Sequence, residues 1–336
     1  MPAAEVTVTT IHPLRAIEGG RVDIDGEGFP VGEELLPTVH IGDLPARLVF
    51  ASSTRLGVIV PPGLDGGRAR VSITPSRNGQ QGFVEIAAPF ATGLHQVDNP
   101  VFDRDGNLYV TYSGTRGQQV PVSIFRVRPN GTRETFSSSI VNPTSMAIDP
   151  SGRLHVSSRF EGTVYRVLPD GTTEAFAHDL GVACGLAFAP DGTLFVGDRS
   201  GTIFRVDPDG QATTFATLPA SVAAFHLAIG PDGALYVTGP TLSSYDPLYR
   251  IEPNGAVSIA YAGFGRPQGL AFDPNGSLYV IDALAGSSGL YLVPAHGAPQ
   301  VVLAGPALVG VAFAADGTLV VASNETAFKI ANRVIG

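Results

Sequence analysis

A single motif occurs six times between Asn99 and the carboxyl terminus: an apolar strand, a turn of the Pro-Asp-Gly type, and a second apolar strand. Gly185–Val196, His226–Val237 and Gly269–Val280 are the clearest copies. The turn glycines are Gly106, Gly152, Gly192, Gly233, Gly276 and Gly317, which are 46, 40, 41, 43 and 41 residues apart. A period of this length with two strands per motif is typical of a β-propeller.

A second pattern runs in register with the first and predicts the third strand of each blade. These strands begin at Ile124, Val164, Ile203, Leu248, Leu290 and Phe328, so the repeat predicts six blades. Phe90–Phe102 aligns without gaps with Phe176–Phe188, which places a fourth-strand equivalent just before the first blade. We therefore expect residues 86–91 to close the ring by pairing with the last blade, which would remove an exposed sheet edge.

Residues 1–86 lack the repeat, and their short alternating stretches separated by Gly, Pro and Asp predict a small β-sandwich. The segments Val22–Phe29, Val39–Gly42, Ser52–Pro62 and Gly66–Ile73 resemble the IPT/TIG family of immunoglobulin-like domains. That resemblance implies a binding or spacer module without catalysis. The sequence thus predicts an all-β chain, with a sandwich at 1–86 and a six-bladed propeller at 87–336 that are rigidly coupled.

The propeller repeats resemble NHL repeats and, more loosely, the senescence marker protein/gluconolactonase propellers. Arg266–Asp282 is the copy most similar to an NHL repeat. Members of these families include binding scaffolds, lactonases and metal-dependent lyases. Because one propeller scaffold carries many activities, the resemblance constrains the fold more than the function.

Charge and composition exclude several classes of partner. The net charge is −9 and the Lys and Arg residues are scattered, which argues against nucleic acid. No apolar run approaches the ~18 residues that a membrane span requires, so we expect no membrane insertion. The amino terminus shows no signal peptide, which favours the cytoplasm unless the sequence has been trimmed. The single cysteine, Cys184, excludes an internal disulfide and leaves the compartment open.

The starts of the first strands mark the mouth of the predicted channel. The positions eight and seven residues before each turn glycine hold Asp98, Thr144, Cys184, Phe225, Gln268 and Val309, then Asn99, Ser145, Gly185, His226, Gly269 and Gly310. The gluconolactonase resemblance implies a divalent cation there, held by Asn and Asp residues and a glutamate. Only Asp98 matches that pattern, so Ca²⁺ or Mg²⁺ bound by Asp98 with the amides of Asn99 and Gln268 is one hypothesis. The alternative is a polar channel mouth without a metal.

The histidines and the cysteine suggest two further catalytic sites, a zinc site and a thiolate–imidazole pair. The amidating-lyase propellers, which are also similar to NHL proteins, bind zinc through three histidines. The candidates here are His226, His95 and His155. Of these, His155 is predicted to pack within a second strand. Cys184 and His226 come from adjacent blades and are candidates for a thiolate–imidazole pair. The alternative is a buried thiol beside a structural histidine.

A mixed set of polar residues follows the second strands, six and seven positions after the turn glycines. It comprises Tyr112, Arg159, Asp198, Arg199, Asp282 and Asn324. With Asp98, Asn99, His226 and Gln268, these residues are predicted to form a ligand-binding face. Arg159 and Arg199 would hold a carboxylate or phosphate, unless they pair with acidic residues between blades.

The leading hypothesis is a non-catalytic recognition or scaffold protein that binds a protein or a small-molecule ligand. The channel mouth and the polar insertions Ser113–Val120 and Thr241–Pro247 would provide the contacts. The alternative is a metal-dependent hydrolase of the lactonase type, or a lyase. Asp98 would then hold the metal, His226 would carry a proton, and Arg159 or Arg199 would bind the substrate. The sequence makes no prediction about oligomeric state.

Overall fold

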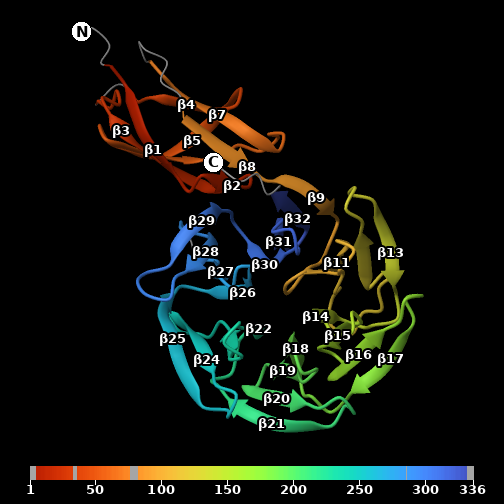
Figure 1. Cartoon of the computed structure of the whole chain (residues 1–336). Coiled ribbons are helices and arrows are strands. Elements are labelled where there is room, and N and C mark those ends of the chain that lie inside the picture. The colour runs from red at the N-terminus through yellow and green to blue at the C-terminus, as the bar shows by residue number, and fades with distance from the viewer. Residues whose placement is uncertain (1–4, 33–35, 76–81, 285, 331–336) are drawn as a thin grey trace.

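The structure is a computed structural model that describes residues 5–32, 36–75, 82–284 and 286–330. These residues form 32 strands and contain no helix. Figure 1 shows a small sandwich seated against a ring of sheets. Among the described residues, no helix has the length and apolar character needed to cross a membrane.

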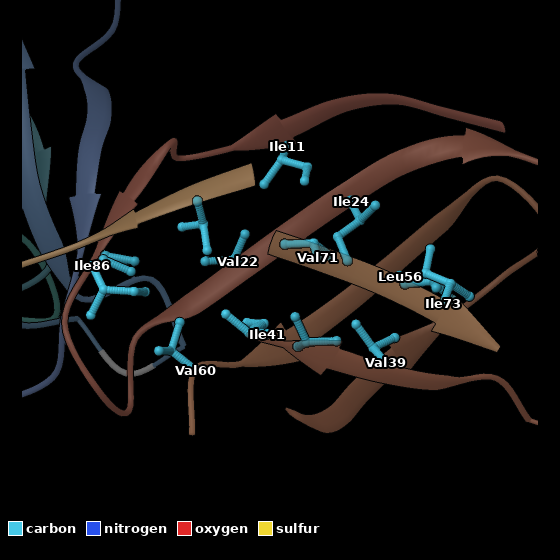
Figure 2. Packing of buried hydrophobic residues seen from close by; sticks show 14 of the residues in the cluster. Ile11, Val22, Ile24, Val39, Ile41, Leu56, Val60, Val71, Ile73 and Ile86 are labelled. Atoms are coloured by element: carbon cyan, nitrogen blue, oxygen red, sulfur yellow. The ribbon is translucent and has the colours of Figure 1, made fainter. Parts of the chain in front are cut away.

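The amino-terminal sandwich consists of eight short strands. They are β1 (Thr7–His12), β2 (Arg15–Ala16), β3 (Arg21–Glu27), β4 (Thr38–Ile41), β5 (Leu44–Ala51), β6 (Arg55–Ile59), β7 (Gly67–Thr74) and β8 (Gly82–Ile86). Their hydrogen-bonded order is β1-β3-β6-β5-β4-β7-β8-β2. Alternate residues such as Val22 and Ile24 point inward and are fully buried, and Figure 2 shows them packed against Ile41, Leu56 and Val71. The period of two in the sequence therefore becomes one apolar face of each sheet.

The ring is built from antiparallel units of four strands. The first is β10 (Val101–Phe102), β11 (Leu108–Thr111), β12 (Ile124–Val127) and β13 (Arg133–Ser137), and the second is β14 (Pro143–Ile148), β15 (Leu154–Ser158), β16 (Thr163–Val167) and β17 (Thr173–Ala177). The third is β18 (Ala183–Phe188), β19 (Leu194–Asp198), β20 (Thr202–Val206) and β21 (Ala212–Thr217), and the fourth is β22 (His226–Ile229), β23 (Leu235–Thr238), β24 (Asp246–Ile251) and β25 (Val257–Phe264).

The last two units lie beside the sandwich. The fifth is β26 (Pro267–Phe272), β27 (Leu278–Asp282), β28 (Gly289–Val293) and β29 (Gln300–Ala304), and the sixth is β30 (Leu308–Phe313), β31 (Leu319–Ser323), β32 (Thr326–Ile330) and β9 (Ala88–Thr92). Only five units are separate sheets, because β26–β29 form one end of a twelve-stranded sheet that continues into the sandwich. The prediction of six blades is corrected accordingly: five four-stranded sheets stand alone, and a further four-stranded unit is part of the sheet that continues into the sandwich.

The turn glycines adopt the conformation that the sequence motif predicts. Gly192 has a φ of 88°, and its N–H donates to the carbonyl of Ala189 at 3.0 Å. The Asp191 carboxylate accepts from the N–H of Thr193 at 2.9 Å. Since only glycine adopts positive φ without a steric cost, an Asp-Gly pair makes this hairpin reproducibly tight.

The ring closes with a strand that precedes the first blade, as predicted. β9 pairs antiparallel with β32, and Ala91 lies opposite Ala327 with both side chains buried. The strand begins at Ala88, two residues after the start of the expected segment 86–91. The outer edge of the sixth blade is thereby covered by a strand from the other end of the chain.

A two-residue strand joins the sandwich to the propeller. β2 pairs in parallel with β8 on one side and with β29 on the other, so that Ala16 lies opposite both Ile86 and Ala304. The N–H of Ile17 donates to the carbonyl of Ala304 at 2.9 Å. Ile17 also belongs to the apolar cluster of the fifth and sixth blades. The contact between the two parts therefore combines backbone pairing with a shared core.

Candidate functional site

Asp98 and His226 meet at the inner side of the ring. Asp98 precedes β10 of the first blade, and His226 is the first residue of β22 in the fourth blade. Figure 1 shows β22 at the inner side of the ring. The Nδ1 of His226 lies 2.5 Å from the Oδ1 of Asp98, and the two side chains are 0% and 2% exposed. The hydrogen bond therefore connects blades that share no sheet.

The surroundings of this pair favour a structural role. The Oδ1 of Asp98 also accepts from the N–H of Asn99 at 2.7 Å. The Nε2 of His226 is enclosed and has no hydrogen-bond partner among the described residues. An enclosed nitrogen leaves no room for a substrate atom. In this structure, His226 is therefore not placed to transfer a proton to or from a substrate.

The amide of Asn99 also connects blades. Its Nδ2 donates to the carbonyl of Leu270 at 2.8 Å, and its Oδ1 accepts from the N–H of Val311 at 2.9 Å. The side chain of Gln268 is half-buried, while its backbone carbonyl accepts from the hydroxyl of Thr238 at 2.6 Å. The side-chain amide of Asn99 is therefore already hydrogen-bonded to the backbone of the fifth and sixth blades.

The donor set for a metal does not fit a hard divalent cation. Ca²⁺ takes ~6–8 oxygen ligands, several of them carboxylates. Asp98 is the one carboxylate among the three proposed ligands, it is bonded to His226, and the oxygen of Asn99 is occupied. In the described part of the chain, no group of three or more His, Cys, Asp or Glu residues is arranged so that it could hold a metal ion. We therefore derive no step through a metal.

The candidate nucleophile Cys184 is held as a thiol. Burial raises its pKa to about 12, the charge of Asp98 adds to this shift, and the charge of Arg159 opposes it. The thiol donates to the carbonyl of Val182 at 3.2 Å. His226 bonds to Asp98 instead, so no thiolate–imidazole contact is present among these residues.

The other two histidine candidates lie apart from His226. His155 is buried in β15 between the rings of Phe176 and Phe188, whose centroids are 5.0 Å and 4.8 Å away. Burial lowers its pKa to about 4. His95 packs edge-to-face on Tyr112 at 6.0 Å, and burial together with the charge of Arg159 lowers its pKa. The side chain of His155 thus packs between two aromatic rings, as an aromatic residue at this position of the second strand would.

Asp198 and Asp282 organise loops. Asp198 accepts from the N–H of Val182 at 2.8 Å and from the hydroxyl of Ser200. Asp282 accepts from the N–H groups of Gly265 at 2.9 Å and Arg266 at 2.7 Å. The two carboxylates occupy equivalent positions in their blades, and both accept hydrogen bonds from backbone N–H groups of the loop before the first strand.

Arg159 and Arg199 occupy equivalent positions in neighbouring blades, directly after β15 and β19. Arg159 is half-buried and Arg199 is exposed. Burial lowers the pKa of Arg159; the nearby Cys184 opposes this shift, and the positive charges of Arg199 and Arg116 add to it. Neither guanidinium forms an ion pair with a carboxylate among the described residues. The alternative of pairing with acidic residues is not found at Asp198, whose carboxylate accepts from the N–H of Val182 and the hydroxyl of Ser200.

Sequence reasoning missed Arg116 and Asn142 as members of this face. Arg116 lies in the polar insertion Ser113–Val120, and Asn142 precedes β14 and holds that insertion through its amide. Two aromatic side chains in the same region are exposed: Tyr112, at 37%, follows β11, and Phe160, at 52%, follows Arg159 in the chain. The Asn-Pro pair at 142–143 indicates a turn. This sequence signal does not indicate that the Asn142 side chain contacts a loop of the first blade.

The chain is therefore all-β, with an immunoglobulin-like sandwich joined to a β-propeller. One face of the propeller carries Arg159 and Arg199, which form no ion pair within the described residues. Residues 7–86 match the IPT/TIG domain family, so the amino-terminal sandwich is a TIG domain, as its sequence motifs predict. No curated protein matches the sequence.

Solved structures share the fold at low sequence identity. An auxiliary nutrient binding protein from Bacteroides ovatus is 14% identical with a TM-score of 0.56, and the match covers 98% of this chain and 99% of that one. A gluconolactonase from Xanthomonas campestris is 16% identical with a TM-score of 0.58, covering 71% and 88%. A catalytically inactive virginiamycin B lyase from Staphylococcus aureus, solved with quinupristin, is 14% identical with a TM-score of 0.52, covering 98% and 96%. The likeness to gluconolactonase propellers is thus confirmed for the fold, while the NHL resemblance stays a prediction.

Proposed function

We propose that this protein is a recognition protein that binds a small ligand bearing a carboxylate or phosphate at the propeller face of Arg159 and Arg199. One observation carries the proposal: two guanidinium groups project from equivalent positions of neighbouring blades and have no carboxylate partner among the described residues. Guanidinium groups bind carboxylates and phosphates through two parallel hydrogen bonds.

The electrostatics of Arg159 support an anionic ligand. Its guanidinium is half-buried, and the charges of Arg199 and Arg116 add to the destabilisation that burial causes. A bound anion would relieve this repulsion, and its interaction would be stronger there than in bulk water because the local dielectric is lower. The rigid propeller would hold both groups in place before binding, which reduces the entropy lost on association.

The alternative is a metal-dependent hydrolase of the lactonase type, or a lyase. The fold of the gluconolactonase and virginiamycin B lyase neighbours favours it. The residues here favour it less, because Asp98 is bonded to His226 and the Cys184 thiol has a pKa of about 12. Elemental analysis of the purified protein, with a panel of lactones, tests this alternative: bound divalent metal together with lactone opening would support it.

Calorimetric titration of the full chain with benzoate, citrate and inorganic phosphate tests the proposal. We expect at least one of these anions to bind, and Arg159→Gln and Arg199→Gln each to weaken its binding about 10-fold or more, as loss of a charge-assisted hydrogen bond predicts. Arg47→Gln is the matched control, since Arg47 is an exposed arginine on the sandwich. Binding that both variants leave unchanged, or no binding of any anion, would refute the proposal.

A further inference from the structure

The insertion Ser113–Val120 of the first blade is held against the second blade by one buried side chain. The Nδ2 of Asn142 donates to the carbonyls of Ser113 at 2.6 Å and Thr115 at 2.7 Å. Its Oδ1 accepts from the N–H of Gly117 at 2.6 Å. Asn142 is 0% exposed, and its bond to Ser113 is buried while those to Thr115 and Gly117 are partly buried. The loop therefore has a defined path.

That path brings Arg116 to the arginine pair. Gly117, the next residue, has a φ of 74° and lies so close to Phe160 that an added Cβ would be 3.1 Å from the ring. Phe160 directly follows Arg159 in the chain, so the loop and the end of β15 are in contact. The charge of Arg116 acts on Arg159, as does that of Arg199.

The charges of Arg116 and Arg199 thus both act on the guanidinium of Arg159. None of Arg116, Arg159 and Arg199 forms an ion pair among the described residues. Like charges held together by folding destabilise one another, and a ligand that neutralises them binds more favourably. One carboxylate carries a single charge, whereas a phosphate monoester carries about −1.5 to −2 at neutral pH and offers three strong acceptor oxygens.

We propose that Arg116, Arg159 and Arg199 form a three-guanidinium site for a phosphate monoester, with Asn142 as the residue that positions Arg116. This rests on the proposed function and specifies the ligand class of the same face. The exposed rings of Tyr112 and Phe160 would contact the organic part of the ester.

Calorimetric titration of the full chain with phenyl phosphate and with benzoate, at low ionic strength, is the test. We expect the wild type to bind phenyl phosphate about 10-fold or more tightly than benzoate, as one additional charge-assisted contact predicts. Arg116→Gln should remove most of this preference while benzoate affinity changes by less than about 2-fold. Arg116 is exposed, so this variant should fold normally.

The positioning role of Asn142 is tested by Asn142→Gly, because glycine accepts the φ of 48° at this position. We expect this variant to lose the same preference and to show faster hydrogen exchange at the Gly117 amide. In the Arg116→Gln background it should cause no further loss of preference, a result that general destabilisation would not produce.

The outcomes separate the two proposals. Equal affinity for both ligands, or a preference that survives Arg116→Gln, overturns the three-guanidinium site and leaves the anion-binding function standing. Binding of neither phenyl phosphate nor benzoate overturns the three-guanidinium site, and if citrate and inorganic phosphate do not bind either, the anion-binding function is overturned as well. If Asn142→Gly fails to fold, Arg116→Gln alone decides the ligand class.

Discussion

His155 occupies the position in the second strand of its blade that an aromatic ring occupies in four others. The equivalent residues are Tyr109, Phe195, Tyr236, Tyr279 and Val320. The imidazole packs between two phenylalanine rings, and burial lowers its pKa to about 4. A titratable group thus fills a place that packing alone would give to phenylalanine or tyrosine, and this makes stability depend on pH.

The sign of that dependence follows from the depressed pKa. Between pH 6.5 and about 4 the unfolded chain binds a proton at His155 that the folded chain does not, so stability falls as the pH falls. His155→Phe should remove about 2.5 kcal/mol of the stability lost between pH 7.5 and pH 4.5. Urea unfolding at the two pH values measures this, with the exposed His178→Gln as control. A variant with the wild-type pH dependence would contradict it.

At the scale of the element, β9 determines how the ring closes. Its Ala91 lies in an apolar cluster with Leu94, Leu108, Val110 and Ala327, which come from both ends of the propeller. The neighbouring Thr92 is exposed. The inward face of β9 therefore packs between the first and last blades, while its outward face is exposed to solvent.

This difference between the two faces predicts the effect of adding a charge. Ala91→Asp places an unpaired carboxylate in the cluster and should lower the free energy of unfolding by about 3 kcal/mol. Thr92→Asp adds the same group to the exposed face of the same strand and should change it by less than about 0.5 kcal/mol. Urea unfolding followed by circular dichroism compares the two. Equal effects would mean that β9 does not close the ring as described.

At the scale of the whole molecule, β2 makes the sandwich and the fifth blade one sheet. Gly20 lies at this contact, where a Cβ would come within 2.4 Å of the carbonyl oxygen of Ala304. At Gly32, also in the sandwich, nothing lies within 4 Å of an added Cβ. The joint therefore tolerates no added methyl group at Gly20.

Gly20→Ala should destabilise the protein by about 1–3 kcal/mol, because an added methyl group must displace backbone. It should also separate the unfolding of the two parts, since Ile17 and Ala304 would lose their hydrogen bond. Differential scanning calorimetry should show one transition for the wild type and for Gly32→Ala, and two for Gly20→Ala. A single unchanged transition for Gly20→Ala would show that the contact does not couple the two parts.

Features that depend on local order along the chain could be predicted from the amino-acid sequence. Turn glycines at a regular period, alternating apolar residues and the motifs of the TIG segment predicted an all-β chain with a sandwich and a propeller. The repeat also placed Arg159 and Arg199 at equivalent positions. These features follow from short-range rules, since a tight hairpin needs a glycine and a half-buried strand needs alternation.

Contacts between residues that are distant in the sequence depend on how the chain folds in three dimensions. His226 bonds to Asp98 across 128 residues, Asn142 holds a loop of another blade beside Arg159, and β2 inserts between the sandwich and the fifth blade. None of these contacts leaves a periodic signal, because each depends on how whole blades are placed around the ring. The role of a polar residue therefore depends on which partner the closed ring places beside it. The carboxylate of Asp98 bonds to the imidazole of His226, whereas the guanidinium groups of Arg159 and Arg199 form no ion pair with any described carboxylate.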